Sequence, residues 1–255
     1  MLRDAPERCI EVVSPDLSVD NHPQTFDLWL WGSDRILSLW PSFSQSPTSK
    51  LVEPSPIVKA AIERNEYYLF LPRGPTSGSR GSISPYERML AIHVRRGDFA
   101  DACLERAKWN STFYSWNLLT ELPDPFIRPP GGGDGTTTPE HTEGYMGRCQ
   151  PSFDAIVRKV RDAREEYAER SKKSRTVLDT LFVMTNEQPG EWLDNLKTTL
   201  RSEGWDTIVT SKELTLDREQ MEVGMAVDME IARRAAVFIG NGVCVLFFVV
   251  FGFVC

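Results

Sequence analysis

Two adjacent arginines, Arg95 and Arg96, are the residues of this sequence best suited to chemistry. They follow an apolar run over residues 88–94 that is typical of a buried strand. Gly97 after them permits a sharp turn. Two guanidinium groups fixed at a strand end can bind a diphosphate through paired hydrogen bonds, with Asp98 orienting one of them. The alternative is an exposed charged turn that binds nothing.

The overall composition restricts the function classes. The chain has 255 residues, a net charge of −7 and a pI of about 5.2, which argues against a protein that binds a nucleic-acid backbone. None of its cysteines has the C-x-x-C spacing of zinc and thioredoxin-type sites. With only three histidines, His22, His93 and His141, a clustered metal site is not expected. His93 lies inside the predicted strand, where a lone histidine is commonly a packed residue.

Two sequence features depend on the cellular compartment. Cys103 and Cys149 flank a long loop region and would pair in an oxidising compartment, whereas two buried free thiols are the alternative. Asn110 begins an Asn-Ser-Thr sequon, which is a glycosylation candidate only if the chain enters the secretory pathway. The first ten residues are charged and contain no apolar run, so we do not expect them to act as a signal peptide.

Apolar periodicity predicts alternating helices and strands after a Pro- and Ser-rich beginning, residues 1–56, that reads as irregular. We expect helices over residues 57–63, 151–170, 192–200 and 217–235, strands over residues 67–71, 88–94, 177–184, 207–210 and 236–239, and a loop over residues 121–148.

This alternation predicts an α/β fold, a Rossmann-like parallel sheet with helices on both faces. In such sheets, ligands bind at the carboxyl ends of the strands. Three loops leave those ends: residues 95–98, 185–187 and 240–242. All of the chemistry proposed from the sequence lies on these loops or on the helix over residues 217–235, which precedes the last loop.

Three segments carry a resemblance to a known family. Residues 92–98 read IHVRRGD and resemble the H-x-R-R-x-D motif of the α-1,6-fucosyltransferase and protein O-fucosyltransferase superfamily. Residues 227–242 read VDMEIARRAAVFIGNG and are similar to that family's segment of an aspartate, a helix and F-I-G-N. Residues 182–187, FVMTNE, resemble its intermediate strand and acidic turn.

The resemblance implies the donor-binding half of a GT-B fold and inverting transfer of fucose from GDP-fucose to a glycan or protein hydroxyl. Arg95 would be the catalytic residue, which contacts the β-phosphate and stabilises charge on the GDP leaving group. Asp228 would accept the N1 and N2 hydrogens of guanine. No metal cofactor is implied, and the location would be the lumen of the ER or Golgi. The implied GDP-fucose-binding residues are His93, Arg95, Arg96, Asp98, Asp228, Asn241 and Gly242.

The sequence also departs from the family's pattern. We divide it into an irregular segment, residues 1–86, a GDP-fucose-binding domain, residues 87–242, and an aberrant apolar tail, residues 243–255. The family's first Rossmann domain is not recognisable before residue 88, and Cys244 and Val245 stand where hydroxyl residues are expected. The alternative is therefore a catalytically inactive GDP-sugar-binding fragment or an interaction module. The tail is shorter than the ~20 apolar residues that span a bilayer. We expect contact with a membrane only if this tail is a genuine part of the protein.

Overall fold

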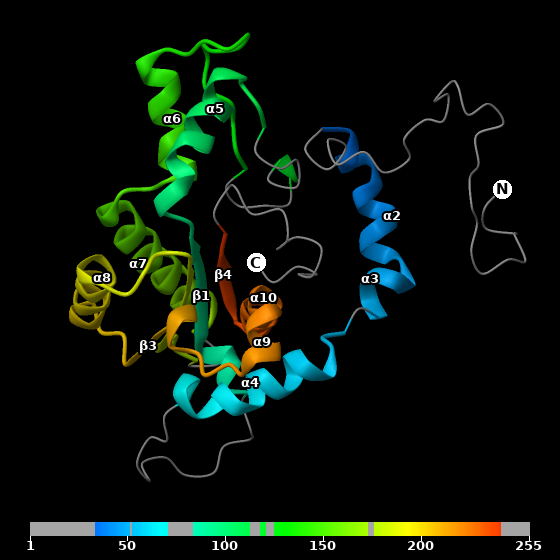
Figure 1. The fold of residues 1–255 in the computed structure, drawn as a ribbon, viewed down its shortest axis with the longest axis vertical. Coiled ribbons are helices and arrows are strands. Elements are labelled where there is room, and N and C mark those ends of the chain that lie inside the picture. Colours follow the sequence, from blue (N-terminus) through cyan, green and yellow to red (C-terminus); the bar gives the residue numbers. More distant parts are fainter. Residues whose placement is uncertain are drawn as a thin grey trace, which may run out of the picture.

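The structure is a computed structural model in which a parallel β-sheet organises the chain (Figure 1). The residues that it describes are 34–51, 53–70, 84–112, 118–120, 125–172 and 176–240. Within them the sheet has four strands: β1 (Met89–Val94), β2 (Thr180–Thr185), β3 (Thr207–Thr210) and β4 (Val237–Ile239). All neighbouring strands are parallel, and their order is β3-β2-β1-β4.

Helices cover both faces of this sheet. On one face, α4 (Pro56–Leu69) and α10 (Gly224–Arg234) pack against Met89 and Ala91 of β1. On the other face, α7 (Phe153–Arg170) and α8 (Glu191–Ser202) pack against Leu90, Ile92 and Val94. The α/β prediction is therefore confirmed, and the arrangement is compatible with a Rossmann-like fold.

The central strands form because their sequences suit burial on both faces. In β1 every residue except His93 is buried, and in β2 all six residues are buried. A strand covered by helices on both sides reads as a nearly continuous apolar run rather than an alternating one. This is why the strands were recognisable from sequence.

Helices α7 and α8 follow their predicted ranges closely. The side-chain oxygen of Ser152 caps α7 by accepting the backbone N–H of Ala155, which satisfies one of the free donors of the first turn. Helix α8 ends before Gly204, whose φ of +89° is readily adopted only by glycine. Both helices bury their apolar stripe under β1 and β2.

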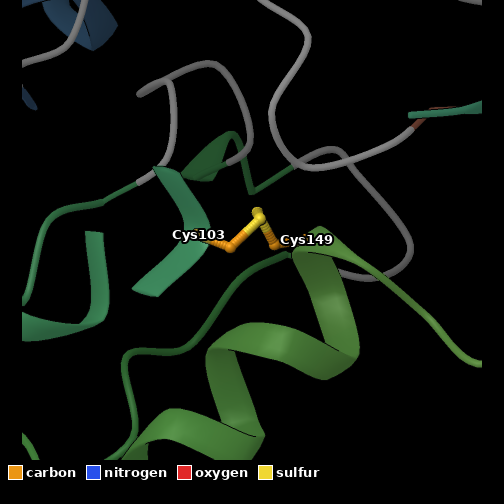
Figure 2. The surroundings of a disulfide bond; sticks show 2 residues. All are labelled: Cys103 and Cys149. Atoms are coloured by element: carbon orange, nitrogen blue, oxygen red, sulfur yellow. A yellow bond between two sulfur atoms is a disulfide. The ribbon is translucent and has the colours of Figure 1, made fainter. Parts of the chain in front are cut away.

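A helical unit is inserted between β1 and α7. It consists of α5 (Ala100–Lys108) and α6 (Pro139–Cys149), joined by a disulfide between Cys103 and Cys149 whose Cα atoms are 5.9 Å apart (Figure 2). Its small core combines the disulfide with Ala107, Phe126 and Tyr145. In Figure 1 this α5–α6 unit lies beyond the carboxyl end of β1.

Several short elements complete the described chain. They are η2 (Asp34–Leu39), α2 (Trp40–Gln45), α3 (Pro47–Leu51), η3 (Pro85–Arg88), η4 (Gly97–Phe99), η6 (Ser211–Glu213) and α9 (Arg218–Glu222). None of the helices in the described ranges is long and apolar enough to cross a bilayer.

Four predictions of secondary structure are wrong. Residues 34–51, which were expected to be irregular, are largely helical in η2, α2 and α3, whereas the helix expected over residues 57–63 is confirmed as part of α4. The strand expected over residues 67–71 is the end of α4, whose buried residues Ile62, Asn65 and Leu69 follow the helical period. The loop expected over residues 121–148 contains most of α6. The single helix expected over residues 217–235 is interrupted at Val223, between α9 and α10.

Candidate functional site

The strand order creates a switch point at the carboxyl edge of the sheet. From β1 the chain continues to β2 and β3 on one side, and β4 returns to the other side of β1. Helices on the two sides therefore diverge at the boundary between β1 and β4, which is where doubly wound sheets bind ligands. Arg95 follows β1 directly at this point, and Gly240 follows β4. Asn241 and Gly242 lie outside the described residues.

Arg95 and His93 share one side of β1. His93 pairs in register with Met184, which belongs to the core under α10. Burial and, second, the positive charge of Arg95 lower the pKa of His93 to about 4, so the imidazole is neutral at pH 7. The Arg95 guanidinium lies 4.9 Å from the centroid of the Phe99 ring. Arg95 thus faces the α10 side of the switch point.

Arg96 lies on the opposite side. Its Nε donates to Glu187 Oε2 at 3.2 Å, and its guanidinium stacks 4.2 Å from the Trp192 ring centroid on α8. Because successive residues of an extended chain point to opposite faces, the two neighbouring arginines diverge. The structure therefore does not bring the guanidinium groups of Arg95 and Arg96 together to bind one diphosphate. Arg96 instead joins the ends of β1 and β2.

The backbone after Arg95 is held by an amide side chain. Asn186 Oδ1 accepts the backbone N–H of Arg96 at 2.8 Å, and Asn186 Nδ2 donates to the carbonyl of Arg96 at 2.7 Å. Gly97 follows with a φ of +71°, in the left-handed region that favours glycine. Asp98 lies in η4, and the expectation that its carboxylate orients an arginine falls outside the described side chains.

Asp228 lies on α10, in the turn that follows buried Val227. The residue as a whole is only half-buried, but loss of water around its carboxylate raises the pKa to about 7. The positive charge of Lys212 acts in the other direction and lowers that pKa. Lys212 belongs to η6, directly after β3, so both charges lie at the carboxyl edge of the sheet.

The remaining candidates lie in the α5–α6 unit. Asn110 has a φ of +46°, and its side-chain oxygen accepts from Tyr145 Oη at 3.3 Å and lies 3.2 Å from His141 Nε2. The sequon amide is thus part of a packed polar cluster. Among the residues that the structure describes, no three His, Cys, Asp or Glu side chains gather where a metal ion could bind.

The sequence indicates the loop of residues 185–187 as a place for chemistry but assigns no role to Asn186 or Glu187, and it gives no indication of a site role for Trp192 or Lys212. Each lies just after β2 or β3, or at the start of α8, so each reaches the carboxyl edge. The usable signal was position: polar residues directly after a buried strand are candidates in a parallel sheet. The exception is Trp192, because the sequence indicates it only as part of the helix expected over residues 192–200.

Comparison of the sequence with known proteins does not identify a family. No protein-family model matches the sequence, and no curated protein matches it.

Proposed function

We propose that the carboxyl edge of the sheet binds a guanosine diphosphate sugar and that the protein is a fucosyltransferase using GDP-fucose. One observation carries the proposal: Arg95 lies at the switch point, on the face of β1 that packs against the helix bearing Asp228. The resemblance of residues 93–98 and 227–240 to fucosyltransferase motifs supports the choice of nucleotide and sugar. In this proposal the sheet is the donor half of a GT-B fold.

Arg95 binds the β-phosphate. Its neighbours favour this role because Phe99 holds the guanidinium from one side and the adjacent imidazole of His93 is neutral. As the bond between fucose C1 and the phosphate oxygen breaks, negative charge grows on GDP. An arginine already in place stabilises that charge without reorganising. A glycan or protein hydroxyl attacks C1 from the opposite side, which inverts the anomeric centre.

Asp228 selects guanine. An ionised carboxylate accepts both the N1 and the N2 hydrogen of guanine, and adenine and uracil do not present this pair of donors. Because the pKa of Asp228 is raised to about 7, the free protein holds this carboxyl partly protonated at neutral pH. Guanine binding then releases the proton, since only the ionised form accepts both hydrogens.

A second candidate is a module that binds a GDP-sugar without transferring the sugar. The position of Arg96 favours it, because the stack on Trp192 and the bond to Glu187 keep that guanidinium away from Arg95. A single arginine then faces the diphosphate among the residues that the structure describes at this edge. Single-turnover assays with GDP-fucose and fucose acceptors separate the two candidates.

The disulfide supports a location for either candidate. Cys103 and Cys149 are both fully buried, and disulfides persist mainly in oxidising compartments. We place the protein in the lumen of the secretory pathway, where glycosyl acceptors occur. No divalent cation is required in the proposed mechanism, so EDTA should leave transfer unchanged.

Calorimetric titration with GDP tests the diphosphate site. Arg95→Ala should weaken GDP binding by about one to two orders of magnitude, because it removes a charge-assisted hydrogen bond. Arg95→Lys should also bind weakly, since an ammonium lacks the planar fork. The matched control is Arg158→Ala, an exposed arginine on α7. GDP affinity that is equal in the wild type and Arg95→Ala would refute the assignment.

The base preference is tested with the same method. Asp228→Asn should remove most of the preference for GDP over UDP, because the amide presents a donor where a second acceptor is needed. The control is Asp162→Asn, an exposed carboxylate on α7. An unchanged ratio of GDP to UDP affinity would remove guanine from the proposal but would leave the diphosphate site standing.

A further inference from the structure

We infer that Asn186 is the residue that positions Arg95 for anion binding. The inference rests on the proposed function for its consequence, but its geometry is independent of any nucleotide. Both polar groups of the Asn186 amide bind the backbone of the same residue: Oδ1 accepts the N–H of Arg96 at 2.8 Å and Nδ2 donates to the Arg96 carbonyl at 2.7 Å. A side chain thus replaces a strand partner.

The two hydrogen bonds between the Asn186 amide and the Arg96 backbone form a clamp. This clamp continues the β1–β2 ladder beyond its last pair. The backbone register ends with Val94 opposite Thr185. Asn186 follows Thr185, and its amide holds the residue directly after Arg95. The backbone on one side of Arg95 is therefore fixed by the ladder and on the other side by the amide. The side chain of Arg95 therefore leaves the backbone in one fixed direction.

The clamp is itself anchored. The backbone N–H of Thr185 donates to Ser211 Oγ at 3.1 Å, and the Ser211 hydroxyl donates back to the carbonyl of Thr185 at 3.1 Å. The hydroxyl of Thr185 in turn accepts the backbone N–H of Glu187 at 3.0 Å. The end of β2 is thereby fixed to the residue after β3, so Asn186 acts from a rigid base.

The turn after the clamp fits the same role. Gly97 adopts its φ of +71° beside Asn186, whose Nδ2 would lie 3.7 Å from a Cβ built on the glycine. The chain therefore bends around the amide. Meanwhile Glu187 and Trp192 hold the side chain of Arg96 on the far face. These contacts of Arg96 are consistent with Arg95 facing the switch point.

The first measurement needs no nucleotide. A ring beneath a guanidinium shifts the NMR signals of its N–H protons, so the Arg95 Nε–H signal reports its place over Phe99. Asn186→Ala should move that signal to the range of exposed arginines. Asn195→Ala, an exposed asparagine on α8, is the matched control and should leave it in place. An unmoved Arg95 signal in folded Asn186→Ala overturns the inference.

The second measurement is a double-mutant cycle on GDP affinity. Asn186→Ala should weaken GDP about tenfold in the wild-type background. In the Arg95→Ala background the same change should alter GDP affinity less than about twofold, because the residue that it positions is gone. An equal loss in both backgrounds overturns the inference, since it would show an effect on the fold rather than on Arg95.

Two safeguards separate the outcomes. If the wild-type protein binds no GDP, the proposed function fails and the NMR measurement alone decides the role of Asn186. If Asn186→Ala does not fold, Asn186→Asp replaces it in the NMR measurement only, because the added charge would itself weaken nucleotide binding. This variant keeps the acceptor for the Arg96 N–H and loses the donor, so a partial shift of the Arg95 signal is expected and an unshifted one overturns the inference.

Discussion

Replacing Asp228 by asparagine is expected to make the protein more stable above pH 7 and to leave its stability nearly unchanged below pH 4. The reason is the raised pKa of Asp228, about 7 against an ordinary value of 3.8. Between these two values the unfolded chain has lost the proton and the folded chain keeps it. The free energy of unfolding therefore falls as the pH rises through this window and is level above it. Asparagine has no proton to lose.

The magnitude follows from the same pKa values. Each pKa unit corresponds to about 1.4 kcal/mol, so the full difference corresponds to about 4 kcal/mol. Because Asp228 is only half-buried, water and local relaxation reduce this upper value, and we expect a gain of about 2 kcal/mol above pH 7.

Urea denaturation at intervals between pH 4 and pH 8.5, without nucleotide, measures this gain. The difference in unfolding free energy between Asp228→Asn and the wild type should rise along the window and then stay constant. His93, whose pKa is lowered to about 4, destabilises both proteins equally in acid, so its contribution cancels in the difference. Asp162→Asn is the exposed control. A difference that does not vary with pH would refute the reasoning.

Two further predictions concern the α5–α6 unit. Gly132→Ala should cost about 3 kcal/mol of stability and Gly133→Ala about 1 kcal/mol. Both glycines have a positive φ, which disfavours alanine. In addition, a Cβ on Gly132 would overlap the His141 ring, whereas a Cβ on Gly133 would meet open space. Thermal melts of the two variants check this, and equal melting temperatures would contradict it. Replacing Cys103 and Cys149 together by serine should cost about 2–4 kcal/mol, because the disulfide closes a segment with a sequence separation of 46. An unchanged urea midpoint in the double variant would show that the bond adds no stability.

The sheet could be predicted from the sequence because each central strand can be recognised from its own residues. Residues 88–94 and 177–184 are mainly apolar runs. Such a run indicates a strand buried on both faces even when the neighbouring strands are unknown. Their parallel pairing followed from the helices between them. The position of Arg95 at the carboxyl edge followed in turn, since a residue directly after a parallel strand always lies there.

The environment of Arg96 could not be predicted in the same way. Its partners Glu187 and Trp192 are distant in the chain, and only the register of β1 with β2 brings them close. The alternation of side chains, which separates Arg96 from Arg95, was available from the expected strand. That alternation continues one residue beyond the strand end, and this is why the expected arginine pair does not form.

Helix α6 was missed for a local reason. Its sequence contains Gly144 and Gly147, which disfavour a helix by about 1 kcal/mol each relative to alanine. Tertiary packing outweighs this cost, because His141, Tyr145 and Cys149 lie one turn apart and are all buried, and the last two belong to the core shared with α5. Gly144 is also required by close packing, since a Cβ there would lie 2.9 Å from Pro129.

The disulfide of the α5–α6 unit shortens the loop that must close when β1 and β2 pair. Met89 of β1 pairs with Thr180 of β2, 91 positions later in the chain. Forming this pair closes a long loop, but once Cys103 and Cys149 are joined, about half of that loop is already bridged. Halving a loop lowers its closure cost by only about 0.6 kcal/mol. Early oxidation should therefore affect the folding rate modestly, while a protease cut inside the bridged segment would leave the two pieces covalently joined.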